Sequence, residues 1–109
     1  MTTPILDLDE WEEAQAQPQV TVNEALRWLE CFSGLVVQSQ SVTSPPTAVD
    51  GDRYIVGDSA TGVWTGHDRK IALLMGGSWR FREAPEGTLA YVIDDVAEFR
   101  YLAGAWAAA

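Results

Sequence analysis

Hydrophobic positions in the first third of the chain recur with the period of a helix. Within residues 21–32, apolar side chains three or four positions apart fall on one face: Val22, Ala25, Leu26, Leu29 and Phe32. Thr21 and Glu24 match the S/T-x-x-E capping pattern, and Gly34 is a natural stop. The spacing predicts an amphipathic helix that buries these five side chains. Trp28 lies off the centre of this stripe, where it either widens the buried face, which is the favoured interpretation, or is presented to a partner.

Beyond Gly34 the pattern is typical of β-structure. A short strand is expected within 34–42, and a loop within 43–52, where two adjacent prolines exclude regular structure. Further strands are expected at 53–57, 70–75, 78–83, 88–94, 97–102 and 105–109. The predicted class is therefore α+β, with one N-terminal amphipathic helix followed by a mainly antiparallel β-meander of short hairpins.

An internal repeat supports the hairpins. The segments 73–79 and 100–106 share an apolar pair, a turn with glycine in its second place, one small residue and a final tryptophan. Each tryptophan, Trp79 and Trp106, opens a returning strand, where its ring can pack on the preceding strand. Both rings are therefore expected to have a packing role.

Length and charge limit the classes of function. The 109 residues predict a single domain over 20–109, preceded by an acidic arm over 1–19. Sixteen acids against seven scattered bases give a net charge of −9, which disfavours nucleic acid and anionic membranes as partners. No apolar run predicts membrane insertion or a secretion signal. The one cysteine, Cys31, is expected to be a buried structural thiol.

The arm combines acidic and apolar residues. Residues 1–19 carry five acids and no base, and four larger apolar side chains stand among them: Ile5, Leu6, Leu8 and Trp11. One interpretation is a loosely docked terminus. The other is a partner-binding arm in which these four residues make the contact and Trp11 is the anchor.

The segment "TGVWTGHDRKIALLMGGSW", residues 61–79, concentrates candidate chemistry. His67 is the only histidine and no nucleophile motif accompanies it, so no catalytic residue, metal site or cofactor is expected. Trp64 lies between two glycines, where an exposed ring could stack on a sugar while His67 and Asp68 bind hydroxyls. The competing interpretation is that all three residues serve turns and packing.

Taken in order, these motifs resemble a known domain family. The motifs are "AQAQPQVTVNEALRWLE", "GDRYIVGDSATGVWTGHD", "PEGTLAYVIDD" and "AGAW", and together they cover roughly residues 14–106. They resemble a family of unassigned biochemical function found in tail fibre and head spike proteins of phages, prophages and the gene transfer agents of alphaproteobacteria. The family's pattern commonly has lysine or histidine where this chain has Pro18-Gln19. No catalytic residue carries over.

The resemblance implies a non-enzymatic virion structural protein, made in the bacterial cytoplasm, that helps to build a host-attachment appendage. Because the chain stops three residues after Trp106, a fibre base or adaptor is expected rather than a complete fibre. Its expected partners are a capsid, tail or fibre protein and further copies of itself. The alternative function is a carbohydrate-binding module for host capsule or surface polysaccharide. A polysaccharide hydrolase is a third, weaker hypothesis.

Overall fold

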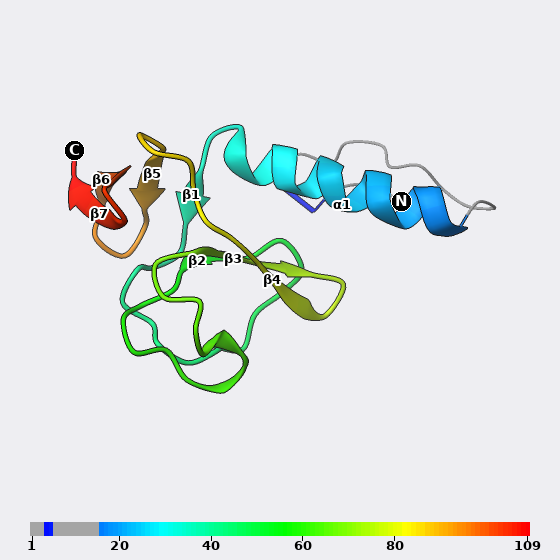
Figure 1. The fold of residues 1–109 in the computed structure, drawn as a ribbon, viewed down its shortest axis with the longest axis horizontal. Helices are drawn as coiled ribbons and strands as arrows, with labels where there is room; N and C mark the ends of the chain where they lie inside the picture. Colours follow the sequence, from blue (N-terminus) through cyan, green and yellow to red (C-terminus); the bar gives the residue numbers. More distant parts are fainter. Residues whose placement is uncertain (1–3, 6–15) are drawn as a thin grey trace.

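One helix and seven short strands make up the fold. The computed structural model describes residues 4–5 and 16–109. Along the chain the elements are α1 (Ala16–Phe32), β1 (Val36–Val37), β2 (Arg53–Ile55), the 3-10 turn η1 (Gly62–Trp64), β3 (Ile71–Met75), β4 (Ser78–Arg82), β5 (Leu89–Val92), β6 (Ala97–Leu102) and β7 (Ala105–Ala108). The predicted α+β class with a mainly antiparallel meander is confirmed (Figure 1).

The strands form two sheets that meet at one junction. The first sheet has the order β1-β5-β6-β7 and the second β2-β3-β4. Every pair is antiparallel except β1 with β5. At the junction, the amide of Gln38 donates to the carbonyl of Arg53 at 2.8 Å, and the amide of Arg53 donates to Gln38 Oε1 at 2.8 Å. These two hydrogen bonds hold the two sheets side by side.

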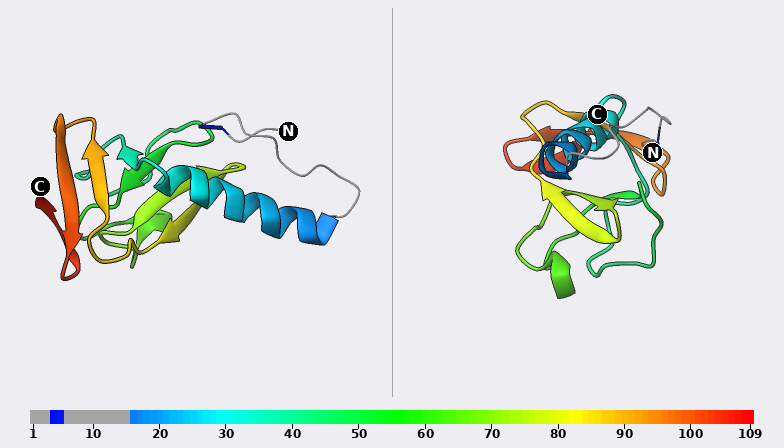
Figure 2. Two further views of the ribbon diagram at one scale, coloured as in Figure 1. Left: turned by 90° about the horizontal axis from the view of Figure 1, so that it is seen from above. Right: turned by 90° about the vertical axis from the view of Figure 1, so that its right-hand side faces the viewer.

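Helix α1 begins earlier than the capping pattern predicts. Its first residue is Ala16, so Thr21 lies inside the helix and the interpretation of Thr21 as an N-cap is wrong. The Ala and Gln residues before Thr21 favour helix, and Pro18 is tolerated because it lies in the first turn. The N-terminal part of the helix extends beyond the strands (Figure 2).

The helix also buries a different face from the predicted one. Arg27, Trp28, Glu30 and Cys31 are buried, whereas Ala25 is exposed and Leu29 is 67% exposed. The predicted apolar stripe is therefore wrong for these two residues, although the expected burial of Trp28 and Cys31 is confirmed. Trp28 has more apolar surface to bury than Leu29, so the rotation that buries the indole is favoured.

Polar side chains on the inner face of α1 have partners that make their burial tolerable. The Arg27 guanidinium lies 3.5 Å from a carboxylate oxygen of Asp50. The Glu30 carboxylate accepts a hydrogen bond from the amide of Ile5 at 2.9 Å. Because charged groups are buried only when paired, these contacts favour the observed rotation of the helix.

Strand β3 lies between two hydrophobic clusters. Its residues Ile71, Leu73 and Met75 join the main cluster, to which α1 contributes Trp28 and Cys31. On the opposite face, Ala72 joins a smaller cluster centred on Trp64. This alternation follows from the two-residue period of a strand, and it makes β3 the shared wall of both cores.

The repeated tryptophans pack as the sequence predicts. Trp79 meets the ring of Trp64 edge to face, with centroids 5.2 Å apart. Trp106 packs on Tyr101 with centroids 5.0 Å apart, and its Nε1 donates to the carbonyl of Arg69 at 2.9 Å. The second contact joins the last strand of one sheet to the loop that leads into the other.

The two tryptophan hairpins use the same turn. Gly76 and Gly77 have φ of 60° and 84°, and Ala103 and Gly104 have φ of 53° and 82°. Positive φ at both central residues defines the type I′ turn, which matches the twist of the flanking strands. Ala103 holds the left-handed conformation despite its Cβ, so this turn is strained where the other is not.

Replacing Ala103 by glycine should stabilise the fold. Removing the left-handed strain should raise the free energy of unfolding by about 1 kcal/mol. Glycine also gives the unfolded chain more conformational freedom, which lowers the free energy of unfolding, so the net increase should be about 0.5 kcal/mol. Urea unfolding of Ala103→Gly beside the wild type measures it. The matched control, Gly104→Ala, should lose stability. A lower free energy of unfolding for Ala103→Gly than for the wild type would contradict backbone strain at Ala103.

Candidate functional site

The loop between β2 and β3 holds the residues predicted from the 61–79 segment. Its base is closed by two backbone hydrogen bonds, from Val56 N–H to the Lys70 carbonyl at 2.9 Å and from Arg69 N–H to the Val56 carbonyl at 2.8 Å. The 3-10 turn η1 lies at its apex and turns Trp64 inward. The loop therefore folds over its own tryptophan.

Trp64 is not an exposed platform. Its exposed fraction is 0%, and its ring is enclosed by Tyr54 and Trp79 with centroids 5.8 and 5.2 Å away. The prediction that this ring is available to stack on a sugar is wrong. Trp64 is the largest fully buried side chain of the small cluster, and Tyr54, Trp79 and Phe81 pack against that cluster.

His67 is held by packing. Its imidazole stacks flat on Phe81, with centroids 3.8 Å apart, and its Nδ1 lies 3.4 Å from Lys70 Nζ. Partial burial, and then the nearby ammonium of Lys70, lower the pKa of His67 below its ordinary value. The contact of Nδ1 with Lys70 and the stacking on Phe81 fit the interpretation of a loop-satisfying histidine.

Asp68 fixes the conformation of the same loop. Its two carboxylate oxygens accept hydrogen bonds from the amides of Ser59 at 2.9 Å and Ala60 at 3.1 Å. These two bonds lower the pKa of Asp68, and the adjacent Arg69 adds to the effect. Ser59 has a φ of 61°, so the carboxylate bridges a turn that is itself strained.

Asp68→Asn should lower the melting temperature at pH 7, because an amide offers one acceptor oxygen to two backbone donors. The lowered pKa of Asp68 means that its contribution is complete above the unfolded value, near 4, and is lost as the pH falls through the folded value. The difference in melting temperature between the wild type and the variant should therefore begin to shrink below about pH 4 and become smaller as the pH falls further toward the lowered pKa of Asp68. Melting curves from pH 3 to 7 test this. A constant difference across that range would contradict it.

A small polar cleft opens beside this loop, where the two sheets meet. Its volume is about 210 Å³, and Trp106 lines it together with Gln40, Asp58 and Arg69. Asp58 and Arg69 form an ion pair at 2.7 Å, and the Gln40 amide donates to Asp95 at 2.6 Å. The cleft combines an indole with three planar polar groups. Because these residues lie far apart in the chain, no local pattern in the sequence predicts the cleft.

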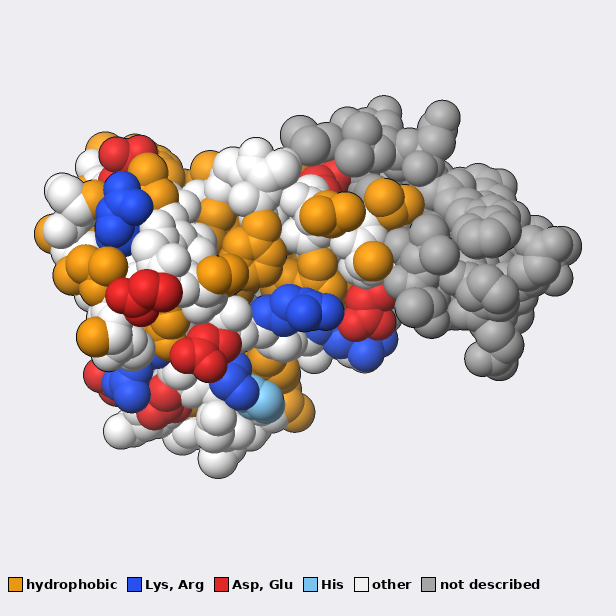
Figure 3. All heavy atoms as spheres, turned by 45° about the horizontal axis from the view of Figure 1, so that its top comes forward, with side chains coloured by type: hydrophobic (Ala, Val, Ile, Leu, Met, Phe, Trp, Pro, Cys, Tyr) orange, Lys and Arg blue, Asp and Glu red, His pale blue; other side chains and the backbone are white. Residues whose placement is uncertain are grey.

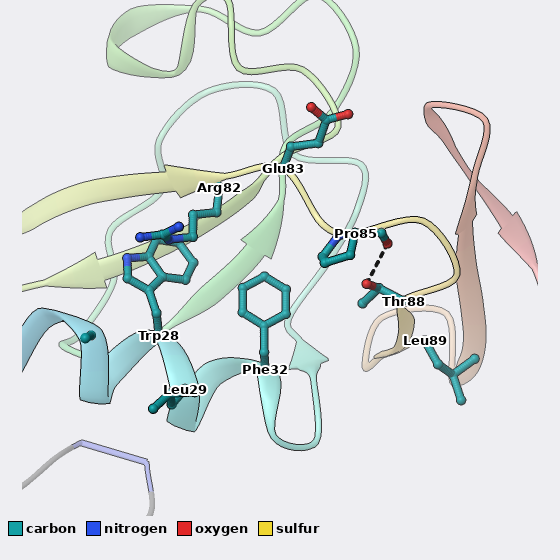
Figure 4. Close-up of a pocket in the computed structure, with 9 residues that line it drawn as sticks. Trp28, Leu29, Phe32, Arg82, Glu83, Pro85, Thr88 and Leu89 are labelled. Atoms are coloured by element: carbon teal, nitrogen blue, oxygen red, sulfur yellow. Dashed lines mark hydrogen bonds between the residues drawn. The ribbon is translucent and has the colours of Figure 1, made fainter.

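A larger, mostly apolar groove lies between α1 and the connection from β4 to β5. Its volume is about 650 Å³. Its lining includes Trp28, Leu29, Phe32, Arg82, Glu83, Pro85 and Leu89 (Figure 4). Leu29 and Leu89 are exposed at its edges. The groove arises because α1 turns Trp28 inward and leaves Leu29 outside.

Stacked aromatic rings form the base of the groove, and charged side chains lie at its edge. The Arg82 guanidinium lies over the Trp28 indole, 5.3 Å from the ring centroid, and the Trp28 and Phe32 rings stack at 5.8 Å (Figure 4). Hydrophobic side chains gather at the centre of this side of the molecule, with both basic and acidic side chains beside them (Figure 3). The groove can therefore take apolar side chains without first rearranging.

Only a partial signal for the groove is present in the sequence. Apolar residues occupy both possible inner faces of the helix, with Trp28 and Cys31 on one and Ala25 and Leu29 on the other. Periodicity alone cannot decide between two helix faces that are offset from each other by one position in the sequence. The large apolar surface of Trp28 is the feature of the sequence that favours the observed face.

Of the four arm residues predicted to bind a partner, the structure places one. Ile5 is half-buried, and its amide bonds to Glu30 on α1. Leu6, Leu8 and Trp11 lie outside the described residues. The partner-binding role of the arm stays a prediction.

Within residues 4–5 and 16–109 there is no group of three or more His, Cys, Asp or Glu side chains placed to hold a metal ion. The helix of the described part is too short and too polar to cross a membrane.

Comparison with known proteins gives a family. Residues 22–107 match the family described as a protein of unknown function (DUF2793). The matched range runs from α1 to β7, so it includes the loop of Trp64, the cleft and the groove. No curated protein matches the chain.

Proposed function

The chain belongs to the DUF2793 family, and from that premise we propose that it is a structural protein of a phage or gene transfer agent particle. In this role it is a spike or fibre base that joins a host-attachment appendage to a capsid, tail or fibre protein. It works through protein contacts and catalyses no reaction. The sequence motifs that resemble those of tail fibre and head spike proteins support the proposal.

The observation that carries the proposal is the apolar groove beside α1. A monomer gains nothing from leaving Leu29 67% exposed next to Leu89, Pro85 and the edge of Phe32. A protein contact would bury these side chains around the Trp28 and Phe32 rings. Protein interfaces commonly have such a buried apolar and aromatic core. Assembly through this groove explains why the helix keeps leucine outside.

The proposal is tested by assembling particles from a variant that places a carboxylate at the exposed edge of the groove. Leu29→Asp should leave the chain folded, with stability within about 0.5 kcal/mol of wild type, because the residue is exposed. Particles made with this variant should lack an appendage, and they should adsorb to host cells at least tenfold less than wild-type particles. Electron microscopy and adsorption counts measure both effects.

A matched control is Leu102→Asp, which changes another exposed leucine on β6, away from the groove. Its particles should be complete. Complete particles with Leu29→Asp, or equal defects in both variants, would contradict assembly through the groove.

A second candidate function, binding of host capsule or surface polysaccharide, is favoured by the cleft of Trp106. An aromatic ring beside planar amide, carboxylate and guanidinium groups suits a sugar, which has apolar faces and hydroxyl edges. Asp58→Ala removes a mostly exposed carboxylate and should leave the fold intact. If the cleft binds sugar, glycan-array signals of the wild type should fall at least tenfold in this variant. Equal signals, or none with wild type, would exclude the cleft.

A further inference from the structure

Strand β7 is the outer strand of the first sheet and has a free edge. The strand order β1-β5-β6-β7 gives it a neighbour on one side only. It lies at the end of the molecule farthest from the start of α1, with no other element beside its outer edge (Figure 2). The free edge is therefore open to a further strand.

The main-chain groups of β7 divide into an inner and an outer set. The amide of Ala109 donates to a carbonyl of β6 at 3.0 Å. Because main-chain groups alternate along an antiparallel pair, Ala105 and Ala107 also turn theirs toward β6. Trp106 and Ala108 turn their amides and carbonyls outward.

The outward groups are fixed in position but unused. Within the part of the chain that the structure describes, the main chain of Trp106 and Ala108 makes no hydrogen bond on the outer side. The strand is nevertheless held in place, since the Trp106 ring packs on Tyr101 and its Nε1 donates to the carbonyl of Arg69. Two amides and two carbonyls therefore stand ready to pair with another strand.

The outer strand of the second sheet is protected against such pairing, and β7 is not. Strand β4 carries exposed Arg80 and Arg82, which would bring like charges together if two copies paired there. Residues 102–109 have no charged side chain and no proline, the features by which natural edge strands prevent pairing with another copy. Two copies with a net charge of −9 each can therefore meet at β7 without opposing like charges.

We propose that β7 pairs antiparallel with β7 of a second copy of this chain, across a two-fold axis at Ala107. In this register Trp106 of each copy is opposite Ala108 of the other, so all the outward amides and carbonyls of these residues are paired. The two four-stranded sheets become one continuous sheet. The inference goes beyond the proposed function and does not depend on it.

The side chains of β7 suit this register. Ala107 meets Ala107 of the second copy at a non-hydrogen-bonded position, where opposed side chains come closest and a methyl group fits. Each Trp106 indole is opposite the methyl group of Ala108. An axis at Trp106 would instead oppose the two indoles and place Ala108 opposite Gly104, which belongs to the turn. The segment is therefore complementary to itself about Ala107.

Disulfide crosslinking of the full chain tests the register. Ala107→Cys, oxidised with copper phenanthroline, should give a disulfide-linked dimer on a non-reducing gel, because the two Cα atoms lie about 4.5 Å apart in this pairing. Cys31 is fully buried, so the wild type should give no dimer.

The matched control is Ala105→Cys, on the same face of the same strand and equally exposed. In the proposed register Ala105 is opposite Ala109 of the second copy, so the two cysteines at position 105 lie about 13 Å apart along the strands. This variant should crosslink at least tenfold more slowly than Ala107→Cys.

A proline on the outer edge tests the hydrogen bonds. Adding Ala108→Pro to Ala107→Cys removes an outward amide, and proline is tolerated at such a position of an edge strand. The chain should stay folded by circular dichroism and crosslink at least tenfold more slowly. Ala108→Ser keeps the amide and should change the crosslinking rate less than twofold.

Three results would overturn the proposal. Equal rates at positions 105 and 107 would show random collision or parallel pairing. Absence of a dimer with Ala107→Cys would leave the edge free or available to a strand of another protein. Undiminished crosslinking by a folded Ala108→Pro variant would show that the outward amide is not used. If the proline variant unfolds, the comparison of positions 105 and 107 decides alone.

Discussion

The rotation of α1 about its axis is the constraint on which the rest of the structure depends. Packing of Trp28 and Cys31 against β3 sets this rotation, and the contacts of Arg27 and Glu30 satisfy the polar groups that it buries. Since Leu29 lies next to Trp28 in the sequence, burying the tryptophan turns the leucine outward. The groove, its aromatic floor and its position beside Arg82 all follow from that choice.

The second cluster depends on β3 as well, but it serves a different purpose. Trp64, Trp79 and Tyr54 fill the space under the loop between β2 and β3, and Asp68 holds that loop closed. Trp106 then ties the last hairpin to the loop through the Arg69 carbonyl. These contacts make a rigid body whose open surfaces, the cleft and the groove, lie at the borders between elements.

The sequence predicted the elements well because their signals are local. The Gly76-Gly77 and Ala103-Gly104 turns and the strands on either side of them depend on near neighbours in the chain. The helix rotation and the burial of Trp64 depend on which distant residues cover them, and no spacing rule contains that information. The groove and the cleft were missed for the same reason: each is lined by residues that only the tertiary fold brings together.

Thiol reactivity tests the rotation of α1 most directly. Burial raises the pKa of Cys31 to about 12, an effect that nearby Arg53 opposes and Glu30 reinforces, so in the folded chain this thiol should not react with a thiol reagent at pH 8. A cysteine at position 29, made as Leu29→Cys in a Cys31→Ala background, should react at a rate close to that of the unfolded chain. Fast reaction at Cys31 together with protection at position 29 would show the opposite rotation and contradict the account.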